Sequence, residues 1–546
     1  MNLSLIKNNG YTWEQRKGVY FKGYFQLREK NKFCVYKGND AIEYFSSVET
    51  AEQLSSMLEC VDGLYALVIV REDKILLAVD RARSMPLYYS DNGLFISDSA
   101  DEIRKSLNIE KDEVDYNNYL ALLCSDYLFG NNTVYSQIKQ LDLGEILEIC
   151  EGELRLKKYF YHLSDISVRS CNQIKKDLSE EAENAFLKLK EVIGNRPVVL
   201  SMSGGYDSRF VGCMLKNIGI TDVSCYTYGK RTSFEVEQSR KNAEALGFRW
   251  TCVEYTDEEV LRAFDEVGHS YFDTYTGHDF TAYLQNFPAV RKLHEENWFK
   301  PNSIFITGLC GDMPTGSYVV PYDSEAVYNV QTAAEHLYGK IFTRCKMNDS
   351  FKKYWINEIV DSLEDLPLTI NDYQSWVTAV DCFYTGTCHS HWFMHMNSVH
   401  SFFGYDWLIP FWNTDLLCQW YSIEADKRLK QKIYEEWLLE DVCAPYGISQ
   451  KKYRASYSRN RTIRKLKYAI GSVLSFLCLH CGIPFKRSYD YNNFAPLELR
   501  VFKSLPCKKT VIYRKAGLPL LLNQYLLQRR YGIKNMIVAR KQVGKK

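Results

Sequence analysis

The chain of 546 residues lacks the features that mark several large classes of protein. Its first ten residues contain no apolar stretch of signal-peptide length, and its 17 cysteines include no pair of CxxC motifs that would form a zinc framework. The net charge is only +1, which argues against a protein that coats nucleic acid. We therefore expect a cytoplasmic protein with reduced thiols and no nucleic-acid partner.

The first third of the chain consists mainly of predicted short strands. Two apolar runs, residues 64–70 and 75–80, flank a charged turn and predict a β-hairpin. A second strand pair is separated by a turn that contains Asn92-Gly93, a dipeptide that favours tight turns. A helical stretch follows at about residues 116–124. These elements predict an antiparallel α+β sandwich, and the chain length predicts two or three domains in total.

A loop of small residues follows the apolar run at residues 198–200, which predicts a buried parallel strand. Residues 203–205 (Ser-Gly-Gly) precede a helical pattern, and such a junction offers backbone N–H groups and a helix dipole to a phosphate. The lysine of a P-loop is missing, whereas Asp207 stands where a carboxylate holds Mg²⁺ against phosphates. A simpler alternative is a strand–turn–helix capped by Ser203 or Asp207. The Ser-Gly-Gly-x-Asp-Ser pattern resembles the pyrophosphate loop of the N-type ATP pyrophosphatases, which cleave ATP between the α and β phosphates.

The same design recurs about a hundred residues downstream. Strands predicted at residues 223–229 and 250–255 alternate with a helix at 233–247, which favours a doubly wound parallel sheet with ligands at the carboxyl ends of its strands. Another strand ends in the Thr307-Gly308-Leu309-Cys310-Gly311-Asp312 segment. Carboxylates at two strand ends suit a Mg²⁺ ion that bridges phosphates.

Further motifs along the chain resemble the glutamine-hydrolysing asparagine synthetases. In the first third they are Gly63-Leu64-Tyr65-Ala66, Val79-Asp80-Arg81, Met85-Pro86-Leu87-Tyr88-Tyr89, Ile96-Ser97-Asp98 and Leu143-Gly144-Glu145. The resemblance implies a glutamine amidotransferase type 2-like domain at 1–165, an N-terminal-nucleophile-hydrolase-like sandwich. It also implies an α/β ATP-pyrophosphatase domain at 175–455 with a helical C-terminal part. We expect residues 456–546 to form a basic, partly helical extension.

Several positions depart from the family pattern. Asn2 stands where the family has its cysteine nucleophile, and an amide cannot perform that attack. Leu309 replaces a glutamate implicated at the aspartyl-AMP stage, and Met313 and Leu408 replace further polar residues. β-Lactam synthetases and lasso-peptide cyclases are similar in having degenerate glutaminase domains. We therefore expect glutamine hydrolysis to be lost.

By this resemblance the protein is an ATP- and Mg²⁺-dependent, AMP-forming ligase. It adenylates a small-molecule, peptide or glycan-linked carboxylate and transfers the acyl group to an amine or ammonia. Lys451 is the expected catalytic residue, which neutralises charge, with Lys452 as its neighbouring alternative. The implied ATP-binding residues are Ser201, Ser203, Gly204, Gly205, Asp207, Ser208, Tyr228, Thr307 and Gly308, and the implied Mg²⁺ ligands are Asp207 and Asp312.

Three alternatives remain open: an asparagine synthetase fed by ammonia, a non-catalytic nucleotide-binding or scaffold protein, and an enzyme that closes an intramolecular amide or modifies a glycan. His391 and His395 have helical spacing without the glutamate of a zinc-protease helix, so we expect packing or substrate contact there. In the C-terminal extension, basic residues at 459–467 precede a short apolar run at 469–479. This pattern fits a packed helix with a solvated tail, or peripheral membrane contact. A homodimer is also allowed.

Overall fold

The computed structural model describes residues 2–29, 32–345, 347–448, 451, 470–471, 474–475, 477–485, 492–505 and 518–533. Lys452, the basic residues at 459–467 and the basic tail after residue 533 lie outside this range, so the predicted membrane contact stays a prediction. Among the described residues, no helix has the length and apolar character needed to cross a membrane.

Two sheets form the N-terminal part of the protein. The larger follows the order β11-β10-β6-β5-β3-β2, with β4 also paired to β3, and all its pairs are antiparallel. The smaller follows the order β1-β8-β7-β9, in which only β1 and β8 run parallel. The strands are β1 (Asn2–Ser4), β2 (Trp13–Arg16), β3 (Val19–Glu29), β4 (Lys32–Lys37), β5 (Asp62–Val70), β6 (Lys74–Val79), β7 (Tyr88–Ser90), β8 (Phe95–Ser97), β9 (Ile138–Gln140), β10 (Glu145–Cys150) and β11 (Glu153–Lys158).

Both predicted hairpins are confirmed. β5 pairs antiparallel with β6, and β7 pairs antiparallel with β8. Gly93 lies in the turn between β7 and β8 with φ of +69°, a conformation that glycine adopts without a steric penalty. The helices of this part are α1 (Gly38–Phe45), α2 (Ala51–Glu59), α3 (Ala100–Ser106) and α4 (Tyr116–Ser125).

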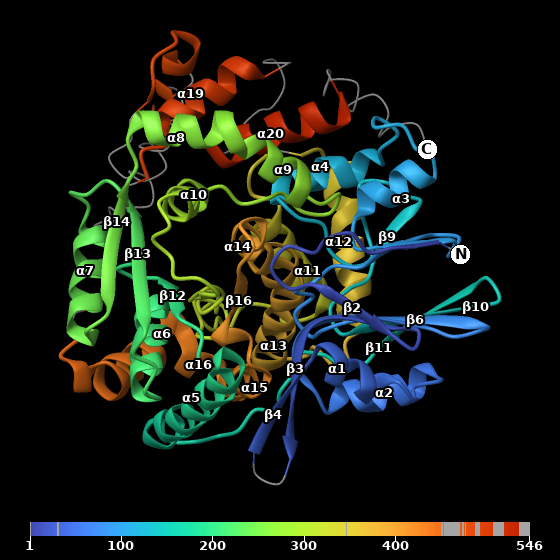
Figure 1. Cartoon of the computed structure of the whole chain (residues 1–546), viewed down its shortest axis with the longest axis horizontal. Helices are drawn as coiled ribbons and strands as arrows, with labels where there is room; N and C mark the ends of the chain where they lie inside the picture. The colour runs from blue at the N-terminus through green and yellow to red at the C-terminus, as the bar shows by residue number, and fades with distance from the viewer. Residues whose placement is uncertain are drawn as a thin grey trace.

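A five-stranded parallel sheet forms the centre of the following part, as the alternation of strands and helices predicted. Its order is β14-β13-β12-β15-β16, and every neighbouring pair is parallel. Figure 1 shows β13 and β14 side by side with α7 next to them. The strands are β12 (Val198–Ser201), β13 (Val223–Gly229), β14 (Arg249–Glu254), β15 (Ile304–Ile306) and β16 (Asp406–Leu408), and the first three helices are α5 (Cys171–Ile193), α6 (Tyr206–Asn217) and α7 (Phe234–Leu246).

Helices make up most of the remaining described chain. A π-helical segment at Thr385–Phe393 and a short 3₁₀ turn at Met394–Asn397 follow α13 and carry the buried histidines. At the C-terminal end, α19 packs on α8 and α20 packs on α4 (Figure 1). The helices are α8 (Asp257–Ala263), α9 (His269–Tyr275), α10 (Phe287–Glu295), α11 (Val330–Ile341), α12 (Asp349–Glu364), α13 (Tyr373–Tyr384), α14 (Ser398–Phe402), α15 (Thr414–Tyr421), α16 (Ala425–Arg428), α17 (Lys432–Trp437), α19 (Ala495–Ser504) and α20 (Leu518–Tyr531).

The two parts share one interior. A single cluster of buried apolar side chains contains Leu77 and Leu147 from the N-terminal sheet as well as Leu200 from the parallel sheet. A fully buried ion pair also crosses the boundary, because the Arg83 guanidinium lies 2.6 Å from the Asp279 carboxylate. The sandwich and the parallel-sheet part are therefore packed as one body.

Candidate active site

The loop after β12 is closed on itself by its two serines. The Ser203 backbone N–H donates to Ser208 Oγ at 3.0 Å, and the two hydroxyl oxygens are also 3.0 Å apart. The Gly205 N–H donates to Ser203 Oγ at 3.1 Å. Gly205 is the N-cap residue of α6, so the loop delivers the chain to the positive end of that helix. This is the strand–loop–helix junction that the sequence predicts for phosphate binding.

The loop after β15 packs directly against the start of α6. A Cβ atom on Gly308 would lie 2.7 Å from the backbone carbonyl carbon of Asp207, and one on Gly311 would lie 2.6 Å from the Asp207 carboxyl carbon. Neither position has room for a side chain. Between them, Cys310 has φ of +71°, a conformation that L-residues with a side chain rarely adopt. The glycines of the second loop thus allow the two loops to approach each other closely.

The two predicted Mg²⁺ ligands lie in one neighbourhood. Asp207 is half-buried and accepts a hydrogen bond from the Tyr434 hydroxyl at 2.9 Å. Asp312 is exposed and accepts a hydrogen bond from Ser317 Oγ at 3.2 Å. Burial, and then the charges of Asp207 and Asp312, hold the pKa of Tyr434 well above its usual range. Gly311, which precedes Asp312 in the chain, packs against the Asp207 carboxyl group, so the two carboxylates belong to adjoining loops.

The donors available fit a magnesium ion that is held jointly by protein and nucleotide. Two carboxylate side chains supply the hard oxygen ligands that Mg²⁺ prefers. Among the described residues, no group of three or more histidine, cysteine, aspartate or glutamate side chains is arranged to hold a metal ion. Phosphate oxygens would have to complete the coordination, as Mg²⁺ commonly requires when it binds with a nucleotide.

The residues predicted to surround the adenosine lie along the neighbouring strand ends. Ser201 is the last residue of β12, and Tyr228 lies near the end of β13 with its ring stacked on Tyr255 at 5.2 Å between centroids. Thr307 follows β15, and its hydroxyl donates to Asn397 Oδ1 at 3.3 Å. The three residues thus extend from the first loop across adjacent carboxyl ends of the sheet.

Lys451 lies at the surface beside the site. Its side chain is 79% exposed, and its ammonium nitrogen is 3.3 Å from a carboxylate oxygen of Glu435. Glu435 follows Tyr434 in α17, so this ion pair places Lys451 next to the helix that contacts Asp207. Its assignment as the catalytic lysine stays a prediction, as does its neighbour Lys452, which lies outside the described residues.

Two further residues contact the site although no sequence pattern predicts their contacts. Tyr434 meets Asp207 from α17, more than two hundred residues along the chain. Gln431 donates to Thr315 Oγ1 at 2.7 Å and to Asp312 Oδ1 at 3.4 Å. Gln431 and the preceding Lys430 both have positive φ, of +61° and +57°. Such strained residues are often found at functional sites, but this conformation cannot be recognised from residue types alone.

Three of the positions that depart from the family pattern, Leu309, Met313 and Leu408, have apolar surroundings. Leu309 packs against the main apolar cluster, and Met313 and Leu408 are 1% and 0% exposed. Leu408 ends β16, and its backbone carbonyl accepts a hydrogen bond from the Thr307 N–H at 3.2 Å. The expected packing of the two histidines is also seen, because His391 Nε2 lies 2.8 Å from Asp142 Oδ1 and His395 stacks on a phenylalanine ring at 4.1 Å between centroids.

Comparisons with known proteins bear on both parts of the chain. A glutamine amidotransferase domain model matches residues 48–160, and an asparagine synthase model matches residues 190–332. No curated protein gives a significant match. Among solved structures, glutamine phosphoribosylpyrophosphate amidotransferase from B. subtilis, complexed with ADP and GMP, is similar at 12% identity, over 55% of this chain and 63% of that one. The TM-score of this comparison is only 0.18.

The asparagine synthase match covers both loops of the site. The amidotransferase match covers most of the N-terminal sheets. Together the two matches, over separate parts of the chain, support an asparagine synthetase-like protein with an amidotransferase-type N-terminal domain.

Proposed function

We propose that this protein uses ATP to adenylate a substrate carboxylate and then transfers the acyl group to an amine or to ammonia. The observation that carries the proposal is the interlocking of the two loops, in which Gly308 and Gly311 pack against Asp207. This contact joins an anion-binding helix start to two carboxylates at one edge of a parallel sheet. Such an arrangement suits a nucleotide whose phosphates are bound at the carboxyl ends of the strands.

In the proposed first step, a carboxylate oxygen attacks the α-phosphorus of ATP. The bond between the α-phosphorus and the bridging oxygen breaks, and pyrophosphate leaves. The positive end of α6, which begins after Gly205, would hold the departing phosphates. Asp207 and Asp312 would hold Mg²⁺, which neutralises phosphate charge when it is bound. Lys451 would neutralise phosphate charge after it leaves its ion pair with Glu435, in which the lysine side chain is 79% exposed.

In the proposed second step, the nitrogen lone pair of an amine attacks the acyl carbon and AMP leaves with the former carboxylate oxygen. The amine must lose a proton, and Leu309 cannot accept it. An acceptor amine that brings its own base, or that loses its proton to solvent, would suit this site better than the aspartate and ammonia of an asparagine synthetase. Of the two candidate reactions, we therefore favour ligation of a carboxylate other than aspartate over asparagine synthesis.

We propose further that glutamine is not the source of nitrogen. Asn2 opens β1, and its amide is not a nucleophile. Cys34 lies within β4, in antiparallel register with Leu27 of β3, in a regular strand rather than at a strand start. The amidotransferase-type domain would then contribute its packing to the ligase instead of a supply of ammonia.

An isotope experiment tests this function. The protein is incubated with ATP, Mg²⁺, a pool of amines and a pool of carboxylates whose oxygens are labelled with ¹⁸O. The products are then resolved by mass spectrometry. The proposal predicts AMP that carries one ¹⁸O atom, together with pyrophosphate and an amide. Asp207→Asn keeps an acceptor for Tyr434 and removes a charge, so it should abolish ¹⁸O transfer. Asp361→Asn, at an exposed position on α12, is the matched control and should retain it.

ADP and phosphate in place of AMP and pyrophosphate would refute adenylation. Release of glutamate from added glutamine would refute the claim about nitrogen. Failure of the chain to bind ATP, measured by calorimetry with Mg²⁺ present, would favour the scaffold alternative.

A further inference from the structure

A cavity lies where the N-terminal domain meets the helices around the parallel sheet. It is lined by Lys7, Trp13, Lys22 and Asp98 on one side and, among others, by Tyr275 and His395 on the other. Its volume is about 70 Å³, measured as the space open to the centre of a water molecule. One water needs roughly 10–15 Å³ in this measure, so the cavity can hold several waters or one small organic molecule.

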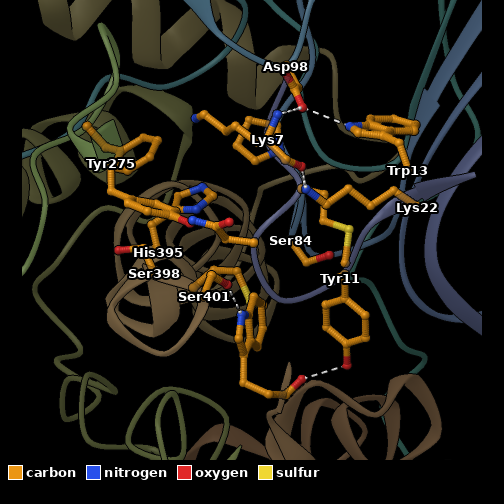
Figure 2. A pocket seen from close by; sticks show the side chains of 16 residues that line it. Lys7, Tyr11, Trp13, Lys22, Ser84, Asp98, Tyr275, His395, Ser398 and Ser401 are labelled. Atoms are coloured by element: carbon orange, nitrogen blue, oxygen red, sulfur yellow. Dashed lines mark hydrogen bonds between the residues drawn. The ribbon is translucent and has the colours of Figure 1, made fainter. Parts of the chain in front are cut away.

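Two ammonium groups point into this cavity. Lys22 is only 8% exposed, and its ammonium donates to the backbone carbonyl of Lys7. The Lys7 side chain extends toward Tyr275, and its nitrogen lies 5.9 Å from that ring centroid (Figure 2). Among the described residues, neither ammonium forms an ion pair with a carboxylate within 4.0 Å. Burial, only partly offset by Asp98, lowers the pKa of Lys22 to about 8 and that of Lys7 from its usual value.

The one carboxylate of the cavity is already engaged. Asp98 accepts hydrogen bonds from the backbone N–H groups of Ile6 and Lys7, each at 2.9 Å, and from Trp13 Nε1 at 2.8 Å (Figure 2). His395 adds no charge, because burial and the nearby Arg83 hold its pKa well below its ordinary value. With two lysines and one carboxylate, the lining of the cavity has one basic side chain more than it has acidic ones.

We propose that this cavity binds one small carboxylate anion, at a site separate from the nucleotide loops. A single anion would balance the extra basic side chain and give both lysines a carboxylate partner in a setting of low dielectric constant, where such hydrogen bonds are strong. This inference does not depend on the proposed ligase reaction.

The walls favour a carboxylate with a short carbon chain over inorganic phosphate. Aromatic and thioether side chains, including Tyr275, Trp407 and Met394, surround the ammonium groups and suit carbon atoms. The serine hydroxyls have partners already: Ser401 Oγ accepts from Trp407 Nε1 at 3.0 Å, and Ser398 Oγ lies 3.0 Å from the Tyr271 hydroxyl. The apolar walls thus suit the carbon chain of a carboxylate better than the several oxygens of a phosphate.

The cavity is adjacent to the nucleotide site without being part of it. Ser398 lines the cavity, whereas its neighbour Asn397 accepts the hydrogen bond from Thr307 of the second loop. Trp407 also lines the cavity, and the next residue, Leu408, pairs with that loop through its carbonyl. Two direct contacts therefore link the wall of the cavity to the end of β15.

The test is calorimetric titration of the full chain with acetate, propionate and succinate, with acetamide as the neutral counterpart and inorganic phosphate as the competing anion. We expect one carboxylate per chain, no binding of acetamide, and weaker binding of phosphate. Lys7→Met and Lys22→Met should each weaken binding about tenfold or more, as expected for loss of a hydrogen bond to a charged group. Lys157→Met, at an exposed position on β11, is the matched control and should bind as the wild type does.

Lys22 is buried, so its variant is first checked for native circular dichroism. If the Lys22 variant does not fold, the test uses Lys7→Met alone, because Lys7 is half-exposed. The proposal is overturned if no carboxylate binds, if Lys7→Met leaves the affinity unchanged, or if phosphate binds more tightly than every carboxylate. Loss of carboxylate binding in Asp207→Asn would also overturn it, because the anion would then occupy the nucleotide site. If Lys7→Met loses carboxylate binding but still binds ATP, the cavity and the proposed nucleotide site are independent.

Discussion

Replacing Gly311 by alanine tests the close packing of the two loops. The new Cβ would lie 2.6 Å from the Asp207 carboxyl carbon and 2.8 Å from Phe411 Cζ. Since carbon atoms at van der Waals contact are about 3.5–4.0 Å apart, one of these groups must move by about 1 Å. Overpacking of this kind costs about 1–3 kcal/mol of stability. A displacement of about 1 Å at a reacting group can also lower the rate about a hundredfold.

Gly339→Ala is the matched control. Gly339 lies inside α11, and no atom is within 4 Å of the Cβ that it would acquire. Alanine in a helix interior is more stable than glycine by about 0.5–1 kcal/mol, so this variant should unfold at a higher urea concentration. Gly311→Ala should unfold at a lower one and bind ATP more weakly by calorimetry. A Gly311→Ala protein with wild-type stability and wild-type ATP affinity would refute the packing described for the two loops.

Three further outcomes follow from single contacts. Tyr434→Phe removes the hydrogen-bond donor to Asp207, so it should lower the free energy of unfolding by about 1 kcal/mol. It should also weaken ATP binding more in the presence of Mg²⁺ than in EDTA. Equal weakening in both buffers would contradict a role of Tyr434 in holding the Asp207 carboxylate. Cys310→Gly should leave the free energy of unfolding within about 1 kcal/mol, whereas Cys310→Val should lower it by about 2 kcal/mol in urea titrations, since a β-branched residue resists positive φ. Burial lowers the pKa of His400 to about 3, so the unfolded chain gains a proton near pH 6.5 that the folded chain gains only near pH 3. Stability is therefore lost as the pH falls through that window. His400→Phe, which keeps a ring stacked on Phe305, should remove about 2 kcal/mol of that loss between pH 7.5 and 5; an unchanged pH dependence would exclude this assignment.

The strands and the two loops could be predicted because their signals are local. An apolar run such as residues 198–200 followed by small residues specifies a strand end wherever it occurs, and Asn92-Gly93 specifies a turn by backbone conformation alone. The repeated Gly-to-Asp pattern then indicates that Asp207 and Asp312 belong to one site. These features depend on few neighbours in the chain.

The missed features depend on contacts between distant segments. Tyr434 reaches Asp207 only because α17 lies beside α6, and no sequence motif around residue 434 predicts that contact. The cavity with Lys7 and Lys22 is assembled from segments of both domains, so neither lysine stands out in the sequence. Sequence patterns give the order of elements, whereas such sites follow from their tertiary packing.

The ion pair between Arg83 and Asp279 has a consequence for how this chain can be divided. Its two members come from different domains, both are fully buried, and breaking such a pair by removing one partner costs about 3–5 kcal/mol. A fragment cut between the domains would also expose the apolar side chains that the two parts share. The halves should therefore melt in one cooperative transition. The second half thus depends on the first for its packing, which gives selection a reason to keep the first half whether or not it performs any chemistry.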